Sequence, residues 1–308
     1  MKNLIRLLSF LPILLAGCNK DDIITDPDGG GPDTPQAVAF TVTEYLPGPG
    51  QYINDPQAGF SGIATMEQAC AYAQRRLDAL NFVSLGAWGG SITVKASETI
   101  PATGGTAYDF SIAGNAFDTS NEPGIVWVMA DSNGNGLPDD TWYELRGSYY
   151  GKEGFKTGYS ITYYRPDAPD ADTHWVASDG TEGTVAWLGN FHSQPYYYPA
   201  WVEADSYTLR GSRLPARVSQ DPATGQWTNA PFEWGYADNS GEDSRIVETG
   251  GRMVQKNFFR ISDAVDADGQ AANLRGIDFI KVQTAVCSSS GWLGEISTEV
   301  CGFFIEGK

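Results

Sequence analysis

A ten-residue segment in the middle of the chain, DSNGNGLPDD, carries side chains suited to a metal site. Side-chain oxygens recur at every second position and an acidic pair follows; the residues are Asp131, Asn133, Asn135, Asp139 and Asp140. A glycine inside this segment permits the tight reversal that lets the oxygens point inward. Hard oxygen ligands in a flexible loop suit calcium. The segment therefore predicts a structural calcium site.

The segment departs from the EF-hand pattern in two ways. Its twelfth position is Trp142 instead of a bidentate acid, and it follows an apolar stretch typical of a strand, not a helix. An Asn-Gly turn followed by a Pro-Asp turn is the alternative interpretation of the same residues.

Catalytic signatures are missing from the sequence. It has no GxSxG elbow, no HExxH zinc motif and no glycine-rich phosphate loop. Glu295 and Glu299 could form a carboxylate pair of the kind that glycosidases use. With 38 acidic residues in the chain, a chance pair is the favoured explanation. We therefore predict a protein that is not an enzyme, and assign no catalytic residue.

An aromatic segment interrupted by prolines, FHSQPYYYPAW, is the candidate for ligand contact. Together with a second aromatic stretch near residue 235, it supplies these candidate residues: His192, Tyr196, Tyr197, Tyr198, Trp201, Trp234 and Tyr236. The prolines keep the segment out of central strands. Exposed aromatic rings form platforms for sugars and other flat ligands. The alternative is that these rings cover the core.

The cysteines sort by position in the chain. Cys287 and Cys301 lie near its end, and in an exported protein they are expected to form a disulfide. Cys70 lies on the apolar face of an expected helix, which predicts a buried, unreactive thiol.

The N-terminus has the pattern of a lipoprotein signal. Basic residues precede a short apolar run that ends in Leu-Ala-Gly-Cys. The run is too short to span a bilayer. Residues 1–17 therefore predict a signal peptide, and Cys18 is the expected lipid-modified residue. The acidic residues that follow resemble the signal for export to the outer face of the outer membrane.

Residues 18–36 then form a flexible spacer rich in Pro, Gly and Asp. We expect the protein to contact the membrane only through its lipid.

The net charge of the chain excludes polyanionic partners. It is −18, and loss of Lys2 and Arg6 with the signal peptide would make it −20. A surface of this charge repels nucleic acid, so we expect no nucleic-acid binding.

Residues 37–308 predict one all-β domain, a jelly-roll-like β-sandwich, with one accessory α-helix near residues 65–81. Apolar or alternating segments bounded by Gly, Pro, Asp or Asn predict strands at 91–98, 124–130, 159–164, 201–211, 257–265 and 276–286. The helix begins with a capping-box pattern at Thr65 and Gln68.

Three segments together resemble a known family. They are 114–148, 259–270 and 276–300, with NGNGLPDD, WYEL and GWLGE as the distinctive motifs. They resemble surface lipoproteins of Bacteroidota that accompany TonB-dependent outer-membrane transporters, some of them similar to accessory lipoproteins of vitamin B12 uptake.

This resemblance implies capture of a nutrient at the cell surface and its transfer to a TonB-dependent transporter. A cobalamin-type corrinoid is the first expectation for the ligand. A glycan-binding module is the alternative, followed by a glycoside hydrolase and then a structural adhesin.

Overall fold

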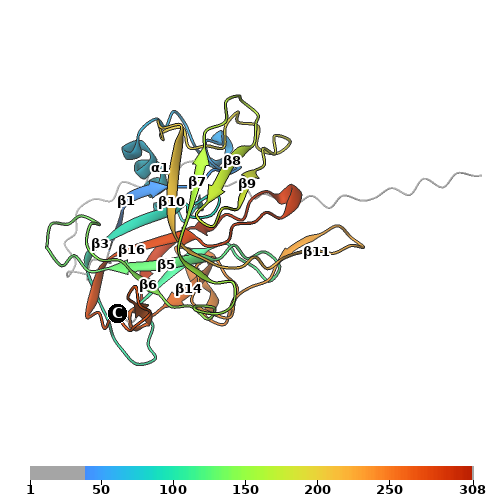
Figure 1. The fold of residues 1–308 in the computed structure, drawn as a ribbon. Helices are drawn as coiled ribbons and strands as arrows, with labels where there is room; N and C mark the ends of the chain where they lie inside the picture. The colour runs from blue at the N-terminus through green and yellow to red at the C-terminus, as the bar shows by residue number, and fades with distance from the viewer. Residues whose placement is uncertain (1–38, 307–308) are drawn as a thin grey trace, which may run out of the picture. The chain divides into compact units, whose positions relative to one another are not determined.

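The computed structural model describes residues 39–306 (Figure 1). The expected signal peptide, the lipid-modified Cys18 and the spacer all lie outside the described residues. The described residues form one unit, mostly β-strand with a single α-helix, which confirms the expected fold class.

The largest sheet has six antiparallel strands in the order β1-β3-β16-β5-β6-β15. Its strands are β1 (Phe40–Leu46), β3 (Ser91–Pro101), β16 (Gly276–Thr284), β5 (Gly124–Met129), β6 (Tyr143–Leu145) and β15 (Ala264–Val265). The most apolar strands, β5 and β16, pair with each other inside the sheet. A continuous apolar stretch is expected there, because inner strands are covered on both faces.

A second sheet of four antiparallel strands packs on the first. Its order is β13 (Ser244–Thr249), β14 (Arg252–Phe259), β4 (Phe110–Gly114) and β18 (Gly302–Ile305). The main hydrophobic cluster joins both sheets: Val94 and Val126 come from the first, and Ile112 and Phe259 from the second. The two sheets therefore form the expected sandwich, with the core between them.

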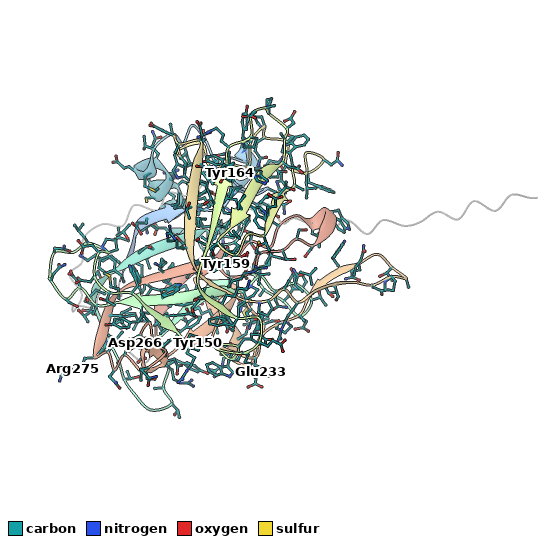
Figure 2. The ribbon with its side chains drawn as sticks, viewed as in Figure 1. Tyr150, Tyr159, Tyr164, Glu233, Asp266 and Arg275 are labelled. Atoms are coloured by element: carbon teal, nitrogen blue, oxygen red, sulfur yellow. The ribbon has the colours of Figure 1, made fainter. Side chains whose placement is uncertain are left out.

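A third sheet has its own hydrophobic cluster. Its order is β10 (Ser206–Arg213), β7 (Lys156–Tyr164), β8 (Thr173–Ala177) and β9 (Glu182–Val185). Figure 2 labels Tyr159 and Tyr164 on β7. The cluster beneath this sheet contains Trp88, Tyr163 and Leu209. It is richer in aromatic rings than the sandwich core.

Short elements complete the fold. Two small sheets are β11 (Val218–Gln220) with β12 (Trp227–Asn229), and β17 (Glu299–Val300) with β2 (Val83–Ser84). The 3-10 helices are η1 (Pro56–Ala58), η2 (Ile261–Asp263) and η3 (Gly291–Leu293). All six strand segments expected from the sequence overlap observed strands.

The α-helix, α1 (Met66–Asp78), confirms the predicted one. The Thr65 side chain accepts a hydrogen bond from the Gln68 N–H, which satisfies one free donor of the first turn. Its apolar face packs on β1, β2 and β18. Cys70 is half-buried against the main cluster, and burial raises the pKa of its thiol. Among the described residues, no helix is long and apolar enough to cross a membrane.

The expected disulfide is not formed. Cys287 and Cys301 are both free thiols. Cys287 packs against the aromatic cluster of the third sheet, whereas Cys301 lies in a separate cluster with Ala113 and Val254. The prediction is wrong because the intervening chain, through η3 and β17, places the two thiols in different parts of the core. Burial raises the pKa of both thiols, that of Cys301 to about 12.

One buried acid in the large sheet makes stability depend on pH. Glu144 on β6 is 5% exposed, its carboxylate accepts a hydrogen bond from Ser212, and burial raises its pKa to about 7. Between the ordinary pKa of a glutamate and pH 7, the folded protein retains a proton that the unfolded chain releases. Stability therefore falls as pH rises through that window.

Substitution of this acid by its amide tests the effect. Between pH 5 and pH 8, the free energy of unfolding should fall by on the order of 2–3 kcal/mol more in the parent than in Glu144→Gln. Urea denaturation at both pH values measures the difference. Equal losses in the parent and the variant would contradict this account.

Candidate functional site

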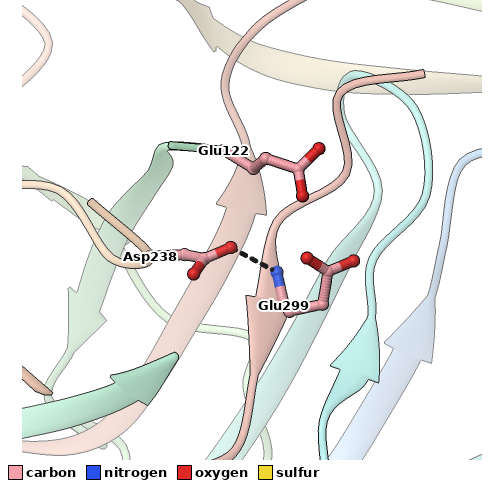
Figure 3. A group of neighbouring side chains, drawn as sticks. All are labelled: Glu122, Asp238 and Glu299. Atoms are coloured by element: carbon pink, nitrogen blue, oxygen red, sulfur yellow. Dashed lines mark hydrogen bonds between the residues drawn. The ribbon is translucent and has the colours of Figure 1, made fainter. Parts of the chain in front are cut away.

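Three acidic side chains from distant parts of the chain converge at one place in the fold. Glu122, Asp238 and Glu299 each offer a carboxylate oxygen, and these oxygens lie within 4.8 Å of one another. Figure 3 shows the three side chains turned toward a common point. We call this group the acidic cluster.

Glu122 is held immediately before β5. Its N–H donates to the carbonyl of Asp238 at 3.1 Å, and its own carbonyl accepts from the Thr298 hydroxyl at 2.7 Å. Its carboxylate accepts the N–H of Ser297 at 3.1 Å. The backbone on both sides therefore fixes where this carboxylate points.

Asp238 occupies a backbone conformation that few residues adopt. Its φ is 52°, in the left-handed region where aspartate is one of the tolerated residues. One carboxylate oxygen accepts the N–H of Asn115 and the other accepts the N–H of Glu299, both at 2.9 Å. Gly114 is required nearby, because a Cβ at that position would lie 2.7 Å from the Asp238 carboxylate.

Glu299 comes from β17, which pairs with β2 through Ser84. The residue is 3% exposed, and its Oε1 has no hydrogen-bond partner among the described residues. Burial and the neighbouring charges of Glu122 and Asp238 raise its pKa well above the usual range. An unpartnered carboxylate oxygen in this environment is costly unless a proton or a cation accompanies it.

A fourth acid, Glu295, lines a cavity together with Glu122 and Glu299. It is 7% exposed; one of its oxygens accepts the N–H of Gln51 at 2.8 Å, while Oε2 has no partner among the described residues. Burial raises its pKa to about 8. The cavity has a volume of about 210 Å³, and Glu122 and Glu299 also line it.

The electrostatics of this cavity favour a positive ligand. No lysine or arginine is among the described residues that line it. Burial raises the pKa of Asp238 to about 8 and also raises that of Glu122, and the charge of Glu122 adds to the effect at Asp238. The nearby Tyr52 has its pKa raised to about 12 by burial and by the charges of Glu299 and Glu122. The site either retains protons or binds a cation.

The acidic cluster has the geometry of a site for a hard cation. Calcium binds oxygen ligands at about 2.3–2.6 Å, so oxygens on one ion can be up to about 5 Å apart. The three oxygens of the cluster, within 4.8 Å of one another, meet that condition. The chain therefore contains a group of carboxylates able to hold a metal ion.

The predicted calcium loop lies elsewhere, after β5. The Asp131 carboxylate accepts the N–H groups of Asn135 at 3.1 Å and Gly136 at 2.8 Å. The Asp139 carboxylate accepts from the side-chain amides of Asn133 and Asn135, and the Asp140 carboxylate accepts from the Ser132 N–H. The structure thus brings the five predicted residues together in an exposed loop.

Most oxygens of that loop are occupied by hydrogen bonds within it. The ammonium group of Lys95 also donates to the Gly136 carbonyl at 3.2 Å, which places a positive charge beside the loop. In the described residues, the close grouping of three acids occurs at Glu122, Asp238 and Glu299 and not in this loop. Calcium binding by the loop remains a prediction.

Most of the aromatic rings predicted to form an exposed platform are buried. Tyr197, Tyr198, Trp201 and Tyr236 are each at most 6% exposed, so the expectation of exposed rings is wrong for these four. The prolines do keep the segment out of a strand, but the rings turn inward and are divided among three hydrophobic clusters. Tyr196 and Trp234 are half-buried.

His192 lies close to the acidic cavity. Its Nδ1 is 2.7 Å from the carboxylate of Asp55, and its ring packs edge-on against Tyr52 at 4.6 Å between centroids. Tyr52 lines the acidic cavity. Of the predicted aromatic residues, His192 is thus linked to this cavity through one intervening ring.

The sequence indicated part of the acidic cavity. Glu295 and Glu299 form the carboxylate pair that the sequence suggests, and both line it. The sequence gives no signal for Glu122 or Asp238. Each follows a polar or turn-like stretch, and no local spacing links two acids that lie so far apart in the chain.

Comparison with known proteins adds no assignment. No model of a known protein family matches the chain, and no curated protein matches it either. The site is therefore interpreted from its own geometry.

Repulsion within the acidic cluster predicts an unusual stability effect. In the presence of a chelator at pH 8, Glu299→Gln should raise the melting temperature by about 2–4 °C, equivalent to about 1 kcal/mol. The amide has a similar shape, can donate a hydrogen bond to Glu122 and carries no charge.

The matched control is Glu248→Gln, an exposed glutamate on β13 for which we expect no change. If Glu299→Gln melts at a lower temperature than the parent at both pH 5 and pH 8, repulsion is not the dominant interaction in the cluster.

Proposed function

We propose that this protein is a surface-anchored, non-enzymatic capture protein whose acidic cluster binds a divalent cation, with calcium as the first candidate. The observation that carries the cation site is the buried, unpartnered Oε1 of Glu299 beside the carboxylates of Glu122 and Asp238. A bound cation would displace the shared protons and offset the repulsion among the three acids.

The donor set favours calcium over softer metals. The three convergent groups are all carboxylates, whereas zinc in proteins is bound mainly by Cys and His. Water in the adjoining cavity can complete a coordination shell of six to eight oxygens, which calcium tolerates because its geometry is flexible.

A cation at this position would strengthen the connection between distant segments. It would join the start of β5, the segment containing Asp238 and the strand β17. The proposed ion is therefore structural.

The proposed cargo comes from the sequence resemblance. It is a corrinoid delivered to a TonB-dependent transporter, with a glycan as the alternative. The acidic cavity of about 210 Å³ is too small for a corrin macrocycle. A broad concave surface of about 970 Å³, lined in part by Tyr164, His174 and Tyr196, offers more room.

A glycoside hydrolase is the second candidate function, because Glu295 and Glu299 share one cavity. Glycosidases need one carboxyl group protonated and its partner ionised. Burial raises the pKa of Glu295 to about 8, and burial together with neighbouring carboxylates raises the pKa of Glu299 well above its usual range, so both favour the protonated form and the site offers no dedicated ionised partner. This difference favours binding over catalysis.

Calcium should stabilise the protein if the acidic cluster binds it. We expect a melting temperature several degrees higher in millimolar calcium than in chelator, since a ligand that binds only the folded state stabilises it. Glu299→Gln should remove most of this shift, whereas Glu248→Gln should retain it.

Asp131→Asn distinguishes the two candidate calcium sites. If that variant loses the calcium shift and Glu299→Gln keeps it, calcium binds the exposed loop and the proposal for the acidic cluster is wrong. An identical melting temperature in calcium and chelator would exclude a stabilising ion at either site.

Titration with cyanocobalamin tests the proposed cargo. We expect saturable heat at micromolar concentrations in calorimetry, together with a change in the corrinoid absorption spectrum. Tyr196→Ala should weaken binding about tenfold if the concave surface is used. The absence of both heat and spectral change would contradict the corrinoid proposal without affecting the calcium site.

A further inference from the structure

A second cavity lies on the other side of Glu295 from the acidic cluster. It has a volume of about 380 Å³, within the range of about 300–1,000 Å³ typical of small-molecule sites. Its walls come from the third sheet and from the segment 287–295. The residues that decide its chemistry are Trp88, Tyr163, Trp175, Thr184, Ser288 and Glu295.

The aromatic walls of this cavity are held in place by the fold. Trp175 on β8 pairs with Gly183 on β9, where a Cβ would lie 2.6 Å from the indole ring. Only glycine therefore lets the indole lie close over the neighbouring strand. Tyr163 donates its hydroxyl to the Trp88 carbonyl at 2.8 Å, which fixes a second ring.

Two buried polar atoms of the lining residues lack partners. Trp88 is 0% exposed and its Nε1 is an unpartnered donor, while Glu295 is 7% exposed and its Oε2 has no hydrogen-bond partner among the described residues. The other oxygen of Glu295 is already held by the Gln51 N–H at 2.8 Å. Unpaired buried polar groups are rare in folded proteins, and a ligand that pairs with them gains specificity.

The charge of the cavity excludes ionic ligands of either sign. No lysine or arginine is among the described residues that line it, so an anion has no partner. Glu295 is the acid in the lining, and burial raises its pKa to about 8, so the group is largely neutral at pH 7. The hydroxyl groups of Thr184 and Ser288 can donate or accept.

We propose that this cavity binds a small, neutral, polyhydroxylated ring of the size of one sugar residue. The apolar face of such a ring packs on the indole of Trp175, and its hydroxyl groups pair with the hydroxyls of Thr184 and Ser288 and with Glu295. The proposal does not need the calcium site, and it gives the alternative cargo, a glycan, a defined position in the fold.

Binding is measured with defined probes on the full chain. Methyl β-glucopyranoside, methyl α-mannopyranoside and methyl β-N-acetylglucosaminide are titrated separately and followed by saturation-transfer NMR and tryptophan fluorescence. Cyclohexanol, an apolar ring with one hydroxyl group, is the control probe. Each titration is made in calcium and in chelator.

Three variants locate the site. Trp175→Ala removes one wall of the cavity. Ala186→Trp fills its mouth, because Ala186 lines the cavity from an exposed position. The second variant is therefore expected to fold even if the first does not. Trp292→Ala removes a tryptophan that is 56% exposed and does not line this cavity, and serves as the matched control.

We expect saturable, millimolar binding of at least one glycoside in calcium and in chelator. Trp175→Ala and Ala186→Trp should weaken it at least tenfold, and Trp292→Ala should not. The proposal is overturned if no glycoside gives a saturable signal, if cyclohexanol binds equally well, or if Ala186→Trp binds as the parent does. Binding in chelator without any effect of calcium on stability would uphold this cavity and reject the calcium site.

Discussion

The carboxylate of Asp238 connects parts of the chain that no local interaction would bring together. It accepts the N–H of Asn115, just after β4, and the N–H of Glu299 on β17 (Figure 3). The position of Glu299, and therefore of the acidic cluster, depends on these two hydrogen bonds. The Asp238 backbone lies in the left-handed region, which few residue types adopt. Few other residues could therefore make these two hydrogen bonds from this position.

The same arrangement creates an energetic conflict. Hydrogen bonds from N–H groups favour the ionised form of Asp238, whereas burial and the charge of Glu122 favour the protonated form and dominate the pKa. Folding thus places like charges together in a poorly solvated cavity, at a cost that hydrophobic packing of the sandwich must offset. Sites that carry such a cost are often sites of binding or chemistry, which is why this cluster rather than the exposed acidic loop is the centre of the proposed function.

Glu295 gives the two cavities a common wall. Its backbone segment, between η3 and β17, separates the acidic cavity from the neutral aromatic cavity, and both are lined by its side chain. One oxygen is fixed by Gln51, and the other has no partner.

The sequence by itself determined the class of fold, a helix near residues 65–81 and six of the strand segments, because periodicity and capping are local properties. It did not determine which aromatic rings are exposed, which thiols meet or which acids converge. Tyr197 is buried, Cys287 and Cys301 are apart, and Glu122 meets Asp238, because strand order and sheet packing decide those neighbours. Contacts between residues far apart in the chain have no local signal, so only the tertiary structure reveals them.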